Sequence, residues 1–228
     1  MTKWFGKRNL TFVGLFALLG FLALQVPLTH LAGSQAKFTL FDAFGPIATG
    51  FIGTIPGIIA VALMQILNFL VHGSKVLDAG TIIRFFPMLF AALYFGKKTK
   101  LNLIIPALAI IIFNLNPIGR SAWIYSMFWL IPIACYFFYE KSLLVRSLGA
   151  TFTAHAVGGA AWVWAFGLSK PIWLALIPVT AIERSAFTLG IAATYLVTNN
   201  VLNFLVQKKI VKWDFLVNQK YVLNWKTA

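Results

Sequence analysis

Long apolar runs, separated by charged residues and by glycine or proline, make up most of this chain. Several of the runs approach the roughly 20 apolar residues that an α-helix needs to cross a bilayer. The pattern therefore predicts an all-α fold, a polytopic transmembrane helical bundle with six to eight spans. The eight candidate spans cover residues 10–30, 38–53, 54–73, 79–96, 101–116, 121–140, 147–168 and 171–206.

The composition agrees with this prediction, because 60% of the 228 residues are hydrophobic and only 11% are charged. Such a chain has too little polar surface for a soluble core surrounded by water. Its one cysteine, Cys135, lies in an apolar run, which excludes an intrachain disulfide and a thiolate metal cluster. We expect a single integral membrane domain over residues 1–206 and a basic, interfacial cytoplasmic tail over residues 207–228.

The distribution of positive charge predicts the orientation in the membrane. With the N-terminus inside, thirteen of the 19 Lys and Arg residues lie on inner segments, four lie on outer loops, and Arg84 and Arg184 lie within spans. Cytoplasmic loops are rich in Lys and Arg, which anionic headgroups attract. We therefore expect a multi-pass protein of the cell (inner) membrane with both termini cytoplasmic. The net charge of +14 then indicates anionic lipids at the cytoplasmic face, and no nucleic acid, as partner.

Polar residues on four different predicted spans fall at one depth in the outer leaflet. A helix rises about 1.5 Å per residue, which places each of them about 6–10 Å below the outer face. They are Asp42, Asn68, Arg84 and Asn114. Tyr125 falls close to the same level, and Trp123 lies two residues away from it. At the mouth of this layer we expect His72, Asp78, Asn116 and Arg120.

Two interpretations of this layer are open. In the first, Asp42 and Arg84 form a structural ion pair, because an unpaired acid in hydrocarbon is costly, and the asparagine amides bond to nearby backbone. In the second, the layer is an outward-opening polar pocket in an apolar wall, which is the usual form of a small-molecule site. The residues that would contact a solute there are Asp42, Asn68, Arg84, Asn114, Trp123 and Tyr125.

A second polar layer lies deeper. His155 and Glu183 both fall about 12 Å from the cytoplasmic face by the same rise per residue. A buried hydrogen bond between them would act as a structural clamp, whereas a proton relay is the sharper alternative because histidine titrates near neutrality. Arg184 points about 100° away from Glu183 on its helix. The face that carries His155 also carries Gly158, Gly159 and Trp162.

Motifs of soluble and intramembrane enzymes are missing from the sequence. There is no HExxH pair, GxSxG elbow, phosphate-binding loop or pair of aspartates on adjacent helices, and the three histidines lack metal-ligand spacing. We therefore expect no enzyme, no cofactor and no metal. One enzymatic alternative stays open, an intramembrane lipid-modifying enzyme that uses Glu183 and His155.

The stretch "FTLFDAFGPIATGFIGTIPGIIAVALMQILNFLVHG", residues 38–73, resembles the substrate-binding S components of energy-coupling factor vitamin transporters, the riboflavin-type members above all. The resemblance continues through "DAGTIIRFFPMLFAALYFGKK", residues 78–98. The matching features are an acid, a proline and a Gly–aromatic pair, then a glycine-rich helix start and a polar helix end. These residues are Asp42, Pro46, Gly50, Phe51, Gly53, Pro56, Gly57, Asn68, His72 and Gly73.

The resemblance implies a membrane uptake protein that binds a small vitamin-like solute from outside. It implies delivery inward with a transmembrane coupling subunit and two cytoplasmic ATPases. The alternative from the residues themselves is a stand-alone proton-linked carrier or channel that uses His155 and Glu183. The two readings differ in their energy source, a partner ATPase in one and a proton gradient in the other.

Overall fold

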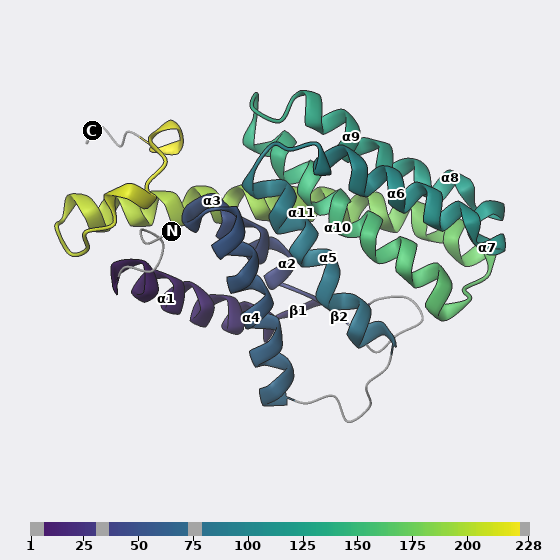
Figure 1. The fold of residues 1–228 in the computed structure, drawn as a ribbon, viewed down its shortest axis with the longest axis horizontal. Coiled ribbons are helices and arrows are strands. Elements are labelled where there is room, and N and C mark those ends of the chain that lie inside the picture. The colour runs from purple at the N-terminus through teal and green to yellow at the C-terminus, as the bar shows by residue number, and fades with distance from the viewer. Residues whose placement is uncertain (1–6, 31–36, 73–78, 224–228) are drawn as a thin grey trace.

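The computed structural model describes residues 7–30, 37–72 and 79–223, and these are almost entirely helical (Figure 1). The helices are α1 (Lys7–Leu24), α2 (Phe41–Phe44), η1 (Gly45–Ile47), α3 (Ala48–Ile52), α4 (Thr54–His72), α5 (Ala79–Gly96), α6 (Leu101–Leu115), α7 (Pro117–Ser121), α8 (Trp123–Ser126), η2 (Met127–Trp129), α9 (Leu130–Phe137), α10 (Leu143–Phe166), α11 (Lys170–Gln207), η3 (Asp214–Leu216) and η4 (Gln219–Tyr221). Two short strands, β1 (Pro27–His30) and β2 (Lys37–Thr39), form an antiparallel pair.

The all-α class predicted from the apolar pattern is confirmed, and the apolar helices are consistent with a helical membrane protein. Within the described residues, three helices are long and apolar enough to cross a membrane, namely α4, α5 and α11. Shorter apolar helices cover Val13–Leu24, Phe41–Ile52, Leu101–Leu115 and Trp123–Phe137. The figure of six to eight spans therefore stays a prediction.

The first predicted span, residues 10–30, is only partly helical. Helix α1 ends at Leu24, and Pro27 opens the strand β1. Proline lacks the N–H that continues a helix, and it pushes the preceding residue toward extended backbone. The chain therefore leaves the helix axis here and returns through β2, so that Phe38 and Lys37 follow a hairpin that the apolar pattern did not predict.

The second predicted span, residues 38–53, is a short and broken helix through α2, η1 and α3. Its twelve helical residues, 41–52, reach about 18 Å at 1.5 Å per residue, which is less than the roughly 30 Å hydrocarbon core. Ile47 and Ala48 are fully buried. The segment packs against α1, α4, α5 and α11, so it is a central core element enclosed by longer helices.

Glycines make the sharp reversal between α3 and α4 possible. Gly53 has a φ of 89°, a value that glycine adopts without steric cost. A Cβ atom on Gly57 would lie 2.6 Å from the backbone of Thr49, so α4 can pack directly on α3 only when residue 57 lacks a side chain. These two positions hold the central segment, and with it Asp42, at a fixed place in the bundle.

Helix α10 lies along α5, and α11 runs along most of the long axis of the view in Figure 1. Helix α11 continues through Pro178 as one helix. Two apolar clusters form around these helices. One contains Phe41, Ile47 and Phe95, and the other contains Phe113, Trp129 and Trp173. A group of polar residues lies where the two clusters meet.

The segment after α11 folds back onto that helix. The side chain of Asn199 donates to the carbonyl of Asn218 and accepts from its N–H, at 3.0 and 2.8 Å. Asn200 donates to the Tyr221 carbonyl at 3.0 Å and accepts from the N–H of Leu223 at 2.7 Å. The tail up to residue 223 is thus attached to the bundle by side-chain-to-backbone hydrogen bonds.

The contact between α3 and α4 generates a first prediction. Gly57→Ala places a methyl group against the Thr49 backbone, and we expect it to lower the free energy of unfolding by about 1–3 kcal/mol through overpacking. Gly14→Ala is the matched control, because residue 14 lies in α1 with no atom within 4 Å of the added Cβ. Its higher helix propensity should stabilise the protein by up to about 1 kcal/mol. Unfolding in detergent measures both, and equal effects would contradict the close packing of α3 on α4.

Candidate functional site

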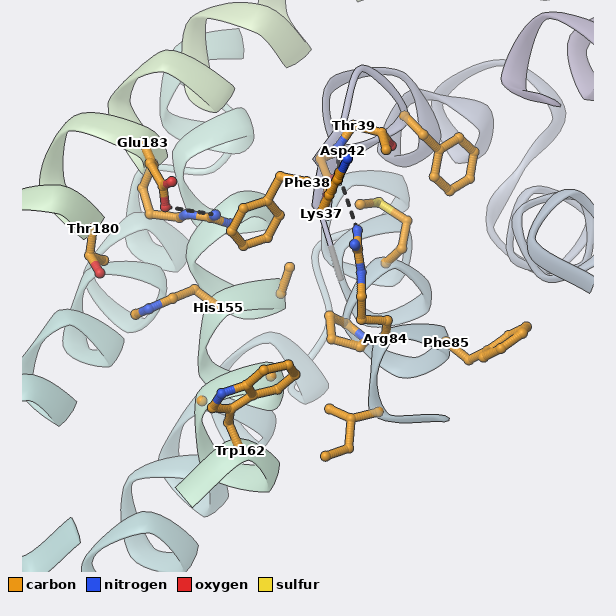
Figure 2. A pocket seen from close by; sticks show the side chains of 18 of the residues that line it. Lys37, Phe38, Thr39, Asp42, Arg84, Phe85, His155, Trp162, Thr180 and Glu183 are labelled. Carbon is orange, nitrogen blue, oxygen red and sulfur yellow. Dashed lines mark hydrogen bonds and ion pairs between the residues drawn. The ribbon is translucent and has the colours of Figure 1, made fainter. Parts of the chain in front are cut away.

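A cavity of about 830 Å³ lies where the two apolar clusters meet (Figure 2). This volume is within the range of about 300–1,000 Å³ that is common for small-molecule sites. Strand β2, the short helix α2 and the helices α4, α5, α10 and α11 all contribute side chains to its lining. Elements from the whole length of the chain therefore meet at one cavity.

One side of the cavity carries the ion pair between Asp42 and Arg84. Nη2 of Arg84 lies 3.6 Å from Oδ2 of Asp42, with 26% of the arginine side chain and 13% of the aspartate side chain exposed. The same Asp42 oxygen accepts a hydrogen bond from the N–H of Thr39 at 2.8 Å. This bond joins strand β2 to helix α2, so the carboxylate has a fixed position and Arg84 a charged partner.

Asn68 lines the cavity near the end of α4, and its side chain is paired across the bundle. Nε2 of Gln25 donates to Oδ1 of Asn68 at 2.9 Å, and the same Gln25 nitrogen lies 2.9 Å from the carbonyl of Phe21. The amide of Asn68 therefore sits at the cavity surface with its carbonyl oxygen directed at the C-terminal end of α1.

His155 lies at the centre of a chain of hydrogen bonds. Nε1 of Trp129 donates to Nδ1 of His155 at 3.0 Å, and the hydroxyl of Tyr125 lies 2.9 Å from Nε2. An indole N–H can only donate, so Nδ1 must be the acceptor and the proton of the neutral ring is on Nε2. Nε2 then donates to Tyr125, whose hydroxyl lies 3.0 Å from that of Thr180. The network assigns His155 a single neutral tautomer.

Arg184 is the most deeply buried charge at the cavity, with 3% of its side chain exposed. Nη1 lies 3.5 Å from the hydroxyl of Thr151, and Nη2 lies 3.8 Å from Oε2 of Glu183. The ring of Phe38 covers the guanidinium at 4.5 Å, and that of Phe187 at 4.8 Å. Aromatic faces favour a cation, which offsets part of the cost of taking this charge out of water.

Phe38 separates the two charged pairs. Figure 2 shows its ring between Glu183 and the Asp42–Arg84 pair. The guanidinium of Arg84 lies 5.7 Å from the centroid of the Phe38 ring, in addition to the closer contact of that ring with Arg184. Strand β1 fixes the hairpin nearby, because the hydroxyl of Thr29 donates to Oε1 of Glu183 at 2.8 Å. The hairpin thus fills part of the space between two arginines.

Most of the candidate residues from the sequence meet at this cavity. Those that line it are Asp42, Asn68, Arg84, Tyr125, His155, Glu183 and Arg184. Asn114 and Trp123 do not. The amide of Asn114 donates toward the carbonyl of Ile110 and the hydroxyl of Ser126, and Trp123 is 54% exposed on the outside of the bundle. Depth along a helix does not give direction around its axis, and both side chains point elsewhere.

The expected hydrogen bond between His155 and Glu183 is not formed. Both ring nitrogens of His155 are occupied by Trp129 and Tyr125, and Glu183 bonds to Thr29 and lies beside Arg184. The two polar layers inferred from depth are one cavity, since His155 and Glu183 line it together with the outer residues. The structural hydrogen bonds here run through Trp129, His155, Tyr125 and Thr180, and Glu183 is not part of this network.

Of the four residues expected at the mouth of the pocket, the structure describes the side chains of two, and neither lines the cavity. Asn116 is buried and accepts from the N–H groups of Ile118 and Gly119 at the start of α7, so it has a structural role as a helix cap. Arg120 is exposed and does not line the cavity. The side chains of His72 and Asp78 lie outside the described residues.

Sequence reasoning missed several residues of the lining. Phe38 was hidden by the unforeseen hairpin. Trp173 and Thr180 precede Glu183 on α11 by ten and three residues, a helical spacing that places all three on one stripe. The polar members of that stripe were the available signal. In the described ranges, no three His, Cys, Asp or Glu side chains are placed to hold a metal ion.

Comparisons with protein-family models, with curated proteins and with solved structures find no match. The similarity of residues 38–98 to the S components of vitamin transporters therefore stays a prediction.

The bonds around His155 generate a second prediction. In the wild type, we expect nitrogen NMR of the imidazole at neutral pH to report a neutral ring protonated on Nε2. Trp129→Phe removes the one donor to Nδ1 that the described residues provide. The variant should lose the fixed tautomer and about 1 kcal/mol of stability.

Trp164→Phe is the control for this change, because that indole donates to the carbonyl of Ile112 at an exposed site. It should leave the His155 signals unchanged. A charged imidazole in the wild type, or identical spectra in the two variants, would contradict the assignment.

Proposed function

We propose that this protein is a membrane uptake protein that binds a small, flat and partly polar solute in the 830 Å³ cavity. One observation carries the proposal. Asp42, Arg84, His155, Glu183 and Arg184 come from four separate helices, α2, α5, α10 and α11, and line one cavity inside a largely apolar bundle. Ionisable groups inside a membrane protein are costly, and where they occur they commonly mark a substrate or ion pathway.

The arrangement in the membrane belongs to the same proposal. The chain crosses the inner membrane six to eight times with both termini in the cytoplasm, as the distribution of Lys and Arg favours. Helix α10 has 24 residues, enough for about 36 Å, and it joins α4, α5 and α11 as a span. In this orientation the cavity residues Lys37, Asn68 and Thr81 lie toward the outside, which supports capture of the solute from there.

Delivery inward uses a partner. The similarity of residues 38–98 to vitamin transporter S components favours a transmembrane coupling subunit and cytoplasmic ATPases, and the sequence contains no phosphate-binding loop of its own. The proton-linked alternative has less support, because it needs His155 free to exchange protons with Glu183. Both nitrogens of His155 are instead engaged by Trp129 and Tyr125.

The Asp42–Arg84 pair gives the third prediction. Asp42→Asn and Arg84→Gln each remove one charge from the cavity lining, and we expect each to lower the amount of co-purifying solute about tenfold, which corresponds to roughly 1.4 kcal/mol of binding free energy. Mass spectrometry of small molecules released from protein purified in mild detergent provides the measurement. Unchanged solute content in both variants would refute the site.

Two matched controls accompany these variants. Asn114→Ala and Trp123→Phe alter candidate residues that the structure places outside the cavity. Both should retain the wild-type amount of solute, while the thermal midpoint of each variant shows whether it is folded. Loss of solute in these controls would place the site elsewhere in the outer leaflet.

The energy source gives the fourth prediction. In cells that express the protein with its coupling partner, uptake of the identified solute should stop when the ATPase is inactivated, and a protonophore should not abolish it while ATP is maintained. The reverse pattern, collapse with the protonophore and survival without any ATPase, would support the stand-alone carrier instead.

A further inference from the structure

We propose that the solute carries a carboxylate, and that Arg184 receives it through the edge formed by its Nε and Nη2 atoms. The inference rests on the proposed function, because it names the chemical class of the solute for the same cavity. The supporting observation is that Arg184 is a buried cation and that its Nε and Nη2 atoms donate no hydrogen bond.

Arg184 has two donors without acceptors. Nε and Nη2 are buried and have no hydrogen-bond partner, while Nη1 is the atom near Thr151. The N–H groups of Nε and Nη2 on one side of a guanidinium are parallel and form a fork that matches the two oxygens of a carboxylate. Burying such donors unpaired is costly, so an acceptor that enters the cavity gains by binding there.

The neighbours of Arg184 cover this edge but give it no hydrogen-bond acceptor. Glu183 stays 3.8 Å from Nη2, beyond hydrogen-bond distance, and its other oxygen accepts from Thr29. Phe38 and Phe187 lie over the guanidinium at 4.5 and 4.8 Å, and ring faces accept no conventional hydrogen bond. Aromatic contacts therefore favour the charge of Arg184, but they leave the fork unused.

The charges around the cavity favour a monoanion. The acids Asp42 and Glu183 face the cations Arg84 and Arg184 as two ion pairs, and Lys37 supplies one further positive charge at the exposed part of the lining. A single negative charge balances this set, whereas a phosphate with two charges would exceed it. A carboxylate combines the planar fork geometry with the single charge.

The surroundings of Arg184 favour an aromatic acid. Trp162, Trp173 and Phe38 line the same cavity, so aromatic side chains surround the space in which a flat solute would lie. Figure 2 shows Trp162 on the side of the cavity away from the Asp42–Arg84 pair. A solute with a ring system among these side chains can direct its carboxylate toward Arg184.

The test uses matched acids and amides as probes. Detergent-purified full-length protein is freed of bound small molecules and equilibrated with an equimolar mixture of benzoate, benzamide, indole-3-acetate, indole-3-acetamide and phenyl phosphate. The retained compounds are then quantified by mass spectrometry. We expect the wild type to retain each acid about tenfold over its amide, as the greater strength of charge-assisted hydrogen bonds predicts, and over phenyl phosphate.

Three variants test Arg184 itself. Arg184→Gln should remove the preference for acid over amide, and Arg184→Lys, which keeps the charge without the fork, should reduce it several-fold. Glu183→Gln removes the nearby negative charge but retains an oxygen for Thr29, so it should increase retention of the acids. An increase cannot result from misfolding, so this variant decides the question even if Arg184→Gln does not fold.

The control is Arg120→Gln, which removes one positive charge at an exposed position outside the cavity lining. It should leave all ratios as in the wild type. Equal retention of acids and amides by the wild type, a preference for phenyl phosphate, or a fall in acid retention in Glu183→Gln would overturn the inference and leave the proposed function intact. Retention of no compound by any variant, together with no co-purifying solute, would overturn both.

Discussion

The burial of the Arg184 guanidinium is the constraint on which the centre of this molecule depends. A cation away from water needs an opposite charge, acceptors or aromatic faces, and here it has all three in part: Glu183 at 3.8 Å, Thr151 at 3.5 Å and the ring of Phe38. Phe38 reaches this place only because the N-terminal hairpin crosses the cavity. The hairpin, α10 and α11 each supply one of these partners, and the cavity lies beside them.

The sequence was a good guide to what lies along each helix. The apolar runs predicted helices α4, α5 and α6 within one residue at their ends, and simple rise-per-residue arithmetic brought Asp42 and Arg84 to one depth, where they do pair. It was a poor guide to what lies around each helix. Asn114 has a suitable depth but turns toward Ser126, because side-chain direction is decided by packing with segments distant in the sequence.

The remaining differences have local causes that a hydrophobicity pattern does not contain. The predicted span of residues 10–30 ran through Pro27, which lies just after the end of α1. The pairing of β1 with β2 is a contact between segments and leaves no periodic signal in such short strands. His155 and Glu183 were expected as partners since both are ionisable and similar in depth. The neutral side chains of Trp129 and Tyr125 bond to the imidazole instead, and a search for oppositely charged partners overlooks such neutral groups.

The segment after α11, residues 208–223, folds back along the end of that helix, and this has a consequence for the lysines that it carries. Asn199 and Asn200 hold the backbone near Asn218 and Tyr221, and Trp213 is almost fully enclosed. The lysines of this segment consequently project from a preformed scaffold, and so do the exposed side chains of Ile210 and Phe215. Whatever surface meets them encounters side chains on a backbone whose conformational entropy was already lost when the protein folded, in contrast to a free polybasic chain.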